Sequence, residues 1–248
     1  TAWGEDTEAT GYAATAWGRE TNATEQYATA WGRNTEATGQ RSTAWGEGTT
    51  ASGLDNTAWG DRTAAIGQFG ATAWGRSSTA SASFSTAFGL GAVAESYGQT
   101  TIGTFNTTQT GSANAIVPSD RLLVVGNGTG TSARSDAMVI LKNGNVGIGV
   151  SNPTTYKLDV AGDINTSGDI RKSGAAYSHP DYVFEQYFEG ESPARVPYKM
   201  LSLQEVEAYV KANKHLPGVQ SRKDIENQGS WDVTENVRTN LEKVEELY

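Results

Sequence analysis

Residues that could carry acid–base or metal chemistry are few, and they lie in the last third of the chain. The 248 residues include no cysteine and two histidines, His179 and His215. His179 directly follows Ser178, and two adjacent residues are poorly placed to form a hydrogen-bonded nucleophile and base. Asp181 could pair with His179 on the surface, and His215 precedes a Leu-Pro-Gly break typical of a turn. This inventory predicts no enzyme activity, no metal site and no cofactor.

Aromatic residues near His179 indicate a second kind of chemistry, the binding of sugar rings or peptides. Flat apolar faces beside hydrogen-bonding groups suit both classes of ligand. Tyr182 and Phe184 alternate in a strand-like stretch, which predicts core positions. We expect His179, Tyr187 and Trp231 in loops at the surface, and they are our candidate ligand-binding residues. The competing interpretation is that most of these aromatic residues form the small core of a cap. The full set is Tyr177, Tyr182, Phe184, Tyr187, Phe188, Tyr198 and Trp231, beside His179, Asp181 and Arg195.

The other six tryptophans recur in a repeat that fills the first part of the chain. The repeat has a period of 14 residues, with one inserted residue between Gly67 and Ala71, and a second Ala-x-Gly step lies halfway through most copies. Four residues of alternating character followed by glycine predict a short strand and a tight turn, because glycine permits the positive φ that turns require. Two such halves, stacked on their neighbours, predict a parallel β-solenoid. Copies of Thr-Ala-Trp-Gly begin at Thr1, Thr15, Thr29, Thr43, Thr57 and Thr72, and a Thr-Ala-Phe-Gly copy begins at Thr86.

The second half of each repeat indicates which way the side chains point. In Glu8-Ala9-Thr10 the two polar residues share one face, so the alanine must face the interior of the coil. If the first half follows the same rule, its alanines fill the interior and its tryptophans point outward. Six outward indoles would expose roughly 900–1,500 Å² of aromatic surface, which a monomer rarely tolerates. We therefore predict a trimer interface formed by Trp3, Trp17, Trp31, Trp45, Trp59 and Trp74. The alternatives are indoles packed inside each coil, and a stack of sugar-binding tryptophans.

Beyond Phe105 the 14-residue period is lost and short β-rich segments follow. Residues 138–141 and 145–149 flank Asn143-Gly144, which predicts a hairpin about an Asn-Gly turn. Lys157 to Val160 and then Asp163-Ile164 repeat the scheme about Ala161-Gly162, so we expect a second hairpin there.

Helical patterns appear in the last segment. Ser202 and Glu205 form a capping box, and the apolar spacing that follows predicts a helix ending at Asn213. We expect a second helix over residues 232–248, with Val237 and Val244 in a coiled-coil trimer interface. One possible seam is Val233, Val237, Asn240, Val244 and Leu247, and the other is Thr234, Val237, Leu241, Val244 and Tyr248. Both seams are still helical in pattern at Tyr248, so we expect the native protein to continue or this chain to be a truncation.

Composition divides the chain into three parts, residues 1–104, 105–176 and 177–248. The first proline is Pro118, the first lysine is Lys142, and both histidines belong to the last part. A net charge of −9 and a sequence pI near 4.8 argue against nucleic acid and anionic lipid as partners. No apolar run approaches the roughly 18 residues that span a bilayer, so we expect no membrane insertion by this segment.

Three resemblances to known families extend these expectations. Residues 1–104 resemble the head repeats of trimeric autotransporter adhesins. The run Asn143–Val150, with residues 157–164, resembles the shaft of phage-tail-fibre-like proteins, and residues 179–248 resemble the C-terminal module of bacterial tail-fibre-domain proteins. The motifs of that module include Pro180-Asp-Tyr-Val-Phe and Lys214-His-Leu-Pro-Gly.

These resemblances imply a mainly β fold with a small α-helical C-terminal region. The expected architecture is a left-handed parallel β-roll, an interwoven β shaft and a helical cap in an intertwined homotrimer. The implied function is adhesion or recognition of a glycan or protein receptor, outside the cell, at a cell surface or on a phage-like particle. The alternative is a purely structural fibre whose C-terminal module drives trimerisation or acts as an assembly chaperone.

Overall fold

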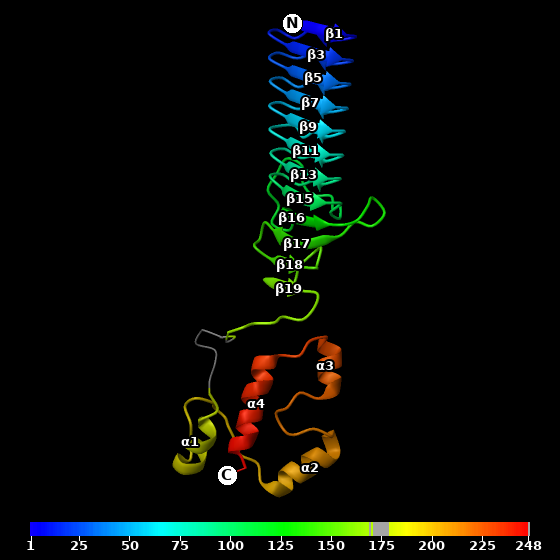
Figure 1. Ribbon diagram of the computed structural model, residues 1–248. Helices are drawn as coiled ribbons and strands as arrows, with labels where there is room; N and C mark the ends of the chain where they lie inside the picture. Colours follow the sequence, from blue (N-terminus) through cyan, green and yellow to red (C-terminus); the bar gives the residue numbers. More distant parts are fainter. Residues whose placement is uncertain (169, 171–178, 248) are drawn as a thin grey trace. The chain divides into compact units, whose positions relative to one another are not determined.

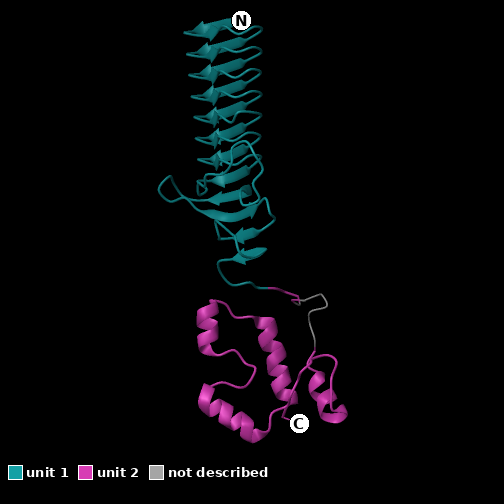
Figure 2. Ribbon diagram, turned by 180° about the vertical axis from the view of Figure 1, so that it is seen from behind, with its two compact units in different colours: residues 1–165 teal, residues 166–248 magenta. Residues whose placement is uncertain are grey.

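The structure is a computed structural model that describes residues 1–168, 170 and 179–247. The chain divides into two compact units, residues 1–165 and residues 166–248 (Figure 2). The first unit is built of strands and the second of helices (Figure 1). Mainly β architecture with a small α-helical C-terminal region is therefore confirmed.

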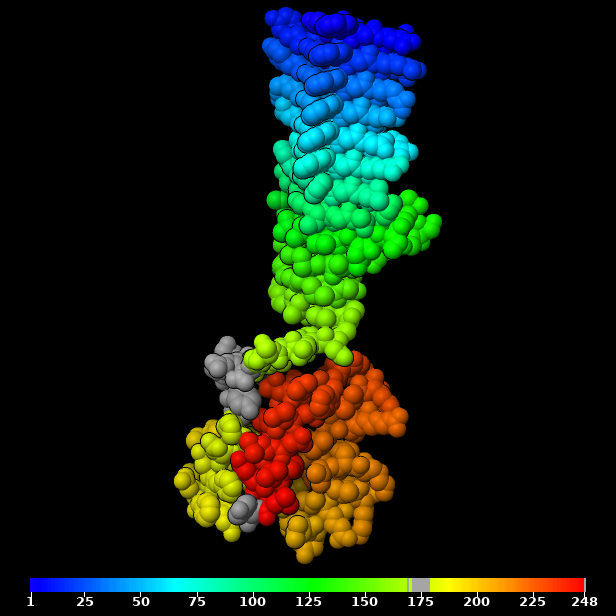
Figure 3. All heavy atoms as spheres, in the orientation of Figure 1, coloured from blue at the N-terminus to red at the C-terminus, as the bar shows by residue number. Residues whose placement is uncertain are grey.

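The 14-residue repeat forms one coil of a solenoid, with a longer and a shorter strand in each coil. Strands of successive coils pair in parallel, so that Trp17 lies beside Trp31 and Ala16 beside Ala30. Stacking continues coil upon coil through this unit (Figure 3). The expected parallel β-solenoid is thus confirmed.

The longer strands, together with the strands of residues 121–160, form one 12-stranded sheet. The shorter strands form a seven-stranded sheet. The longer strands are β1 (Ala2–Glu5), β3 (Thr15–Arg19), β5 (Thr29–Arg33), β7 (Thr43–Glu47), β9 (Thr57–Asp61), β11 (Thr72–Arg76), β13 (Thr86–Leu90) and β15 (Thr100–Thr104). The shorter strands are β2 (Glu8–Ala9), β4 (Asn22–Ala23), β6 (Glu36–Ala37), β8 (Thr50–Ala51), β10 (Ala64–Ala65), β12 (Thr79–Ala80) and β14 (Val93–Ala94).

Alanine fills the interior of the coils, as the sequence predicts. Every buried member of the solenoid's apolar cluster is an alanine, among them Ala30 and Ala44, which are fully buried. Ala2 of the first coil is exposed. A core of methyl groups brings the two sheets close together, so the space inside each coil cannot hold an indole.

Glycine has a different role in the repeat from the one expected. The Trp-Gly glycine lies inside a strand, where a Cβ on Gly32 would meet the carbonyl oxygen of Gly46 at 1.9 Å. The turns place glycine in the left-handed region in some coils, such as Gly48 at φ 62°, and other residues in most, such as Glu20 at φ 55° and Asn34 at φ 52°. Close approach of successive coils, together with a positive φ of 127° at Gly32 inside the strand, is therefore what requires glycine here.

Residues 121–160 continue the same sheet beyond the repeats. β16 (Arg121–Asn127) pairs in parallel with β15, and β17 (Asp136–Leu141) and β18 (Val146–Ile148) follow in antiparallel register. The hairpin about Asn143-Gly144 is confirmed. The second expected hairpin is wrong, because β19 (Leu158–Val160) pairs in parallel with β18 and no strand follows at residues 163–164.

The sheet is continuous across residue 104, where the sequence predicts a boundary. A small cluster of Val124, Val139 and Leu141 replaces the alanine core at this end. Arg121 and Asp136 are buried there as an ion pair with 3.3 Å between Nη2 and Oδ2. Division at residue 104 and interweaving of three chains stay predictions.

Four helices make up the described part of the second unit: α1 (Tyr182–Glu189), α2 (Leu203–Asn213), α3 (Arg222–Gln228) and α4 (Val233–Glu245). The capping box of Ser202 and Glu205 and the helix end at Asn213 are confirmed. α4 begins after the N-cap Asp232, as expected, but it ends at Glu245, short of the expected end at residue 248. Helix α3 was not expected, although Ser221 and Asp224 form a second capping box at its start.

The strand-like interpretation of residues 180–184 is wrong, because this stretch begins α1. Alternation of Tyr182 and Phe184 covers too few residues to specify a strand. Phe184 instead stacks on Phe188 four residues later, with 6.5 Å between ring centroids, which is a contact of a helix face. Tyr182 is fully buried as expected, whereas Phe184 remains 37% exposed and is not a core residue.

Candidate functional site

The six tryptophans form a continuous stack on one outer face of the solenoid. Ring centroids of neighbouring tryptophans lie 5.0–5.4 Å apart and their planes differ by 1–9°. Phe88 of the next coil extends the stack at 4.5 Å from Trp74. Between 42% and 71% of each indole is exposed in the single chain. The alternative in which the indoles pack inside the coils is therefore wrong.

Backbone register holds this stack in place. Parallel in-register pairing puts each indole directly beside the next, and the glycine after it lets neighbouring coils approach. Strand alternation places the residue two positions after each tryptophan on the same face. Arg76 and Asp61 form an ion pair there at 3.0 Å, and Arg33 pairs with Glu47. The result is an aromatic stripe, which we call the tryptophan ladder, bordered by exposed charges of both signs.

A second candidate lies between α1 and α4 in the helical unit. A pocket of about 270 Å³ is lined by Val183, Phe184, Tyr187, Phe188, Met200 and Glu245. Tyr187 is exposed at the surface, as predicted, but it lies on α1 and not in a loop. Aromatic rings around one carboxylate offer both apolar contact and hydrogen bonding to a ligand.

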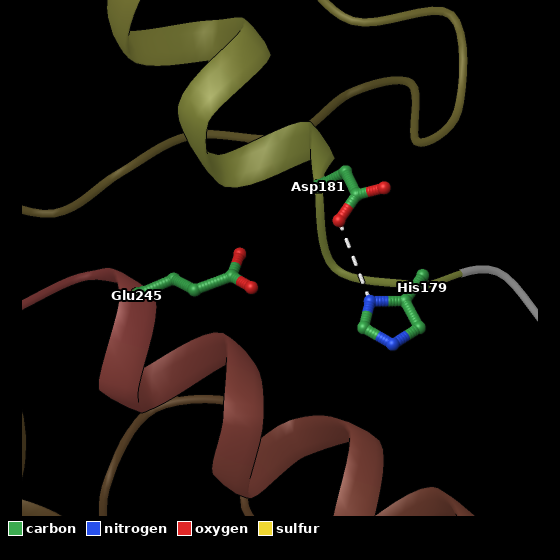
Figure 4. Close-up of side chains that lie close together, drawn as sticks. All are labelled: His179, Asp181 and Glu245. Carbon is green, nitrogen blue, oxygen red and sulfur yellow. Dashed lines mark ion pairs between the residues drawn. The ribbon is translucent and has the colours of Figure 1, made fainter.

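Glu245, which lines this pocket, also lies close to His179. The Nδ1 of His179 is 3.4 Å from a carboxylate oxygen of Asp181. Ligand-type atoms of His179, Asp181 and Glu245 all lie within 4.8 Å of one another (Figure 4). Burial raises the pKa of Glu245, and the charge of Asp181 raises it further while His179 opposes the change.

Trp231 lies apart from the other two candidates. It precedes Asp232, the N-cap of α4, whereas Glu245 ends that helix, and 13 helical residues span roughly 20 Å. Both Trp231 and His179 lie outside helices and strands, as predicted. The structure thus brings His179 and Tyr187 to one end of α4, around Glu245, and leaves Trp231 at the other. Tyr177, Ser178 and Tyr248 fall outside the described residues.

Glu245 is the residue that the sequence analysis missed. It is separated from Asp181 by more than sixty residues, and it belongs to neither coiled-coil seam. Nothing in its local pattern distinguishes it from the other glutamates of α4. Only the packing of α1 on α4 identifies it.

The exposed stripe of α4 settles which seam faces outward in the single chain. Val233, Val237 and Val244 are 56–59% exposed, and Leu247 is more exposed still. The opposite face buries Asn236, Thr239 and Glu242. Val237 and Val244 therefore lie on the outward seam with Asn240, where the 3-and-4 spacing suits a partner helix.

Comparison with known families supports the interpretation of the repeats. The sequence profile described as YadA head domain repeat (2 copies) matches residues 23–46, 37–69 and 69–92. These matches lie within the coils that carry the tryptophan ladder, so this region is similar to an adhesin head. No curated protein matches the chain.

Within the described ranges 1–168 and 179–247, every helix is too short or too polar to cross a bilayer. The matched repeats and the solenoid fold indicate a structural adhesin rather than an enzyme, and a protein exposed at a surface.

Proposed function

We propose that this chain is part of a homotrimeric extracellular fibre that acts in adhesion or receptor recognition. The observation that carries the proposal is the tryptophan ladder, whose indoles are stacked in register and 42–71% exposed in one chain. Similarity of residues 23–92 to the YadA head domain repeat supports an adhesin-type fibre.

The ladder is better suited to self-association than to solvent. A contiguous stripe of six indoles is larger than the apolar patches that monomers usually expose. Three copies related by a threefold axis would bury the same face of every chain, and closed symmetry leaves no copy with an unpaired stripe. Regular charges beside the stripe would then set the register between chains.

Helix α4 supports the same assembly. Its outward seam of Val233, Val237, Asn240, Val244 and Leu247 has coiled-coil spacing and is largely exposed in the single chain. Three such seams would form a parallel coiled coil, in which a polar residue such as Asn240 fixes the register.

The mass of the chain in solution tests the proposal. Light scattering coupled to size-exclusion chromatography should give three times the chain mass of 26.3 kDa. A folded monomer would overturn the trimer, because the ladder would then be stable in water.

The alternative function is a purely structural fibre, and the seam of α4 favours it because trimerisation alone accounts for that face. Binding to a glycan array and to cultured cells distinguishes the two. Saturable binding by the trimer supports adhesion, whereas a stable trimer that binds nothing supports the structural alternative.

A further inference from the structure

His179, Asp181 and Glu245 form a cluster that the proposed fibre function does not use. They come from two elements, the segment that leads into α1 and the last turn of α4 (Figure 4). Their ligand atoms, one imidazole nitrogen and two carboxylate oxygens, lie within 4.8 Å of one another. The His179 and Asp181 side chains are 56% and 75% exposed, so an ion can reach them from solvent.

A second observation points to a positive charge between these groups. Oxygen Oε2 of Glu245 is buried and has no hydrogen-bond partner among the described residues. A buried carboxylate oxygen without a donor is costly, and the cost rises when a second carboxylate lies nearby. Asp181 is that second carboxylate. A cation bound between the two would satisfy both.

Ligand chemistry selects the class of cation. Magnesium and calcium prefer oxygen ligands alone, whereas an imidazole nitrogen with carboxylates suits zinc and neighbouring first-row ions. Three protein ligands leave room for water in an open coordination sphere. We propose that His179, Asp181 and Glu245 bind a divalent transition-metal ion of the zinc class.

Such an ion would act as a staple in the helical unit. It would join the start of α1 to the end of α4, next to the buried pair Tyr182 and Val183. With Pro180, these two are the buried apolar side chains in the described part of this unit. Where the core is this small, metal binding contributes directly to folding.

Titration of the untagged chain of residues 1–248 with cobalt chloride and zinc chloride tests the site. We expect one equivalent of Co²⁺ per chain to give visible ligand-field absorption, and Zn²⁺ to displace it. Zinc should also raise the melting temperature of the helical circular dichroism signal. Because the chain has no cysteine and two histidines, competing sites are few.

Three variants locate the binding. His179→Ala and Asp181→Asn should each abolish the cobalt absorption and the zinc-induced shift in melting temperature. His215→Ala is the matched control and should retain both, because His215 lies in a turn beside Tyr209, with 5.4 Å between ring centroids. Asp181→Asn is nearly isosteric, so it tests the ligand set even if the histidine variant fails to fold.

The possible results are decisive in both directions. Saturable binding that the His179 or Asp181 variant loses and the His215 variant keeps establishes the site. Absence of saturable binding in the unmodified chain overturns it. Binding that survives Asp181→Asn, or disappears in His215→Ala, also overturns it, since the ion would then be held elsewhere.

Discussion

The solenoid and the helical unit reach stability by opposite routes. Alanine and the backbone ladders of two sheets hold the solenoid together, and each coil contacts only its neighbours. In the helical unit, α1 and α4 meet around a few buried polar groups. Tyr182 donates a hydrogen bond to Glu242 within this group, and Arg238 Nη1 donates to Tyr182 Oη at 2.6 Å.

This difference shows where each unit can change and where it cannot. A solenoid coil needs only small interior residues and close backbone approach, so its outward side chains can vary outside the tryptophan ladder. The helical unit has no such redundancy, since the contact between α1 and α4 depends on one carboxylate, that of Glu242. Both units leave apolar surface exposed in the single chain, as one regular stripe in the first and as a helix seam in the second.

The largest expected effect comes from closing the gap between coils. Gly32→Ala would place a Cβ 1.9 Å from the carbonyl oxygen of Gly46, at a φ of 127° that alanine rarely adopts. We expect a loss of more than about 4 kcal/mol in the free energy of unfolding, because the backbone of two coils must separate. Thermal unfolding followed by β-sheet circular dichroism measures it.

The matched control is Gly130→Ala, in the same unit. A Cβ there meets nothing within 4 Å. This variant should melt like the unmodified chain. Equal melting of the Gly32 variant and the control would show that the coils are not as closely packed as described.

Loss of one indole from the tryptophan ladder should have the next largest effect. Truncation of a buried aromatic side chain costs about 3–5 kcal/mol, so Trp31→Ala should lower the melting temperature of a trimer in which the ladder is buried. Tyr27→Ala is the control, because this tyrosine belongs to the neighbouring coil and is 50% exposed, against 47% for Trp31. If both variants melt alike, the ladder faces solvent and becomes a candidate ligand surface again.

A smaller effect is expected from Glu242, and only in the helical unit. Glu242→Gln removes the charge that faces Arg238 and Arg195, and the loss of a buried charged partner should cost about 1–3 kcal/mol. Helical circular dichroism should report this loss while the solenoid signal stays unchanged. A simultaneous loss in both signals would contradict the independence of the two units.

Acid should act through the same residue. Burial alone would raise the pKa of Glu242, but hydrogen bonds from Tyr182 and Lys243 outweigh it and the net pKa is lowered. A lowered folded-state pKa stabilises the fold above the ordinary glutamate value near 4.3, and this contribution disappears as the pH falls through the folded-state value. The unmodified helical unit should therefore lose stability below about pH 4.3, and Glu242→Gln should reduce that sensitivity.

The smallest effect on stability, and a large one on binding, is expected at the exposed aromatic residues. Tyr187→Ala and Trp231→Ala should leave the melting of the trimer unchanged and abolish binding to cells or glycans. Because the two residues lie at opposite ends of α4, loss in one variant alone assigns the receptor to one end. If both variants fail to fold, these aromatic residues belong to the core of the cap.

The repeats could be predicted in detail because their period is itself a structural quantity. The Thr-Ala-Trp-Gly motif at 14-residue spacing specifies the length of a coil, its interior residues and its outward residues. The alanines lie inside and the tryptophans outside, as this pattern predicts. The role of Gly32 could not be predicted, because close approach depends on the neighbouring coil.

The helical unit was harder to predict because, as at Gly32, its packing depends on contacts with other segments of the chain. A capping box is local, so the start of α2 was found. Burial of Glu242 and the meeting of His179 with Glu245 depend on contacts between α1 and α4, which local spacing does not encode.

The inserted residue between Gly67 and Ala71 has a consequence for how such a fibre can evolve. The turn absorbs it completely, and Trp59 still pairs with Trp74 in register. An insertion in a turn can therefore leave the strand register unchanged. Duplication of whole repeats would lengthen the solenoid by about 4.8 Å for each copy. Duplication of half a repeat would instead place a shorter strand beside a longer one and interrupt the tryptophan ladder. The length of the solenoid therefore changes in steps of one whole coil, and duplication of one repeat adds one coil.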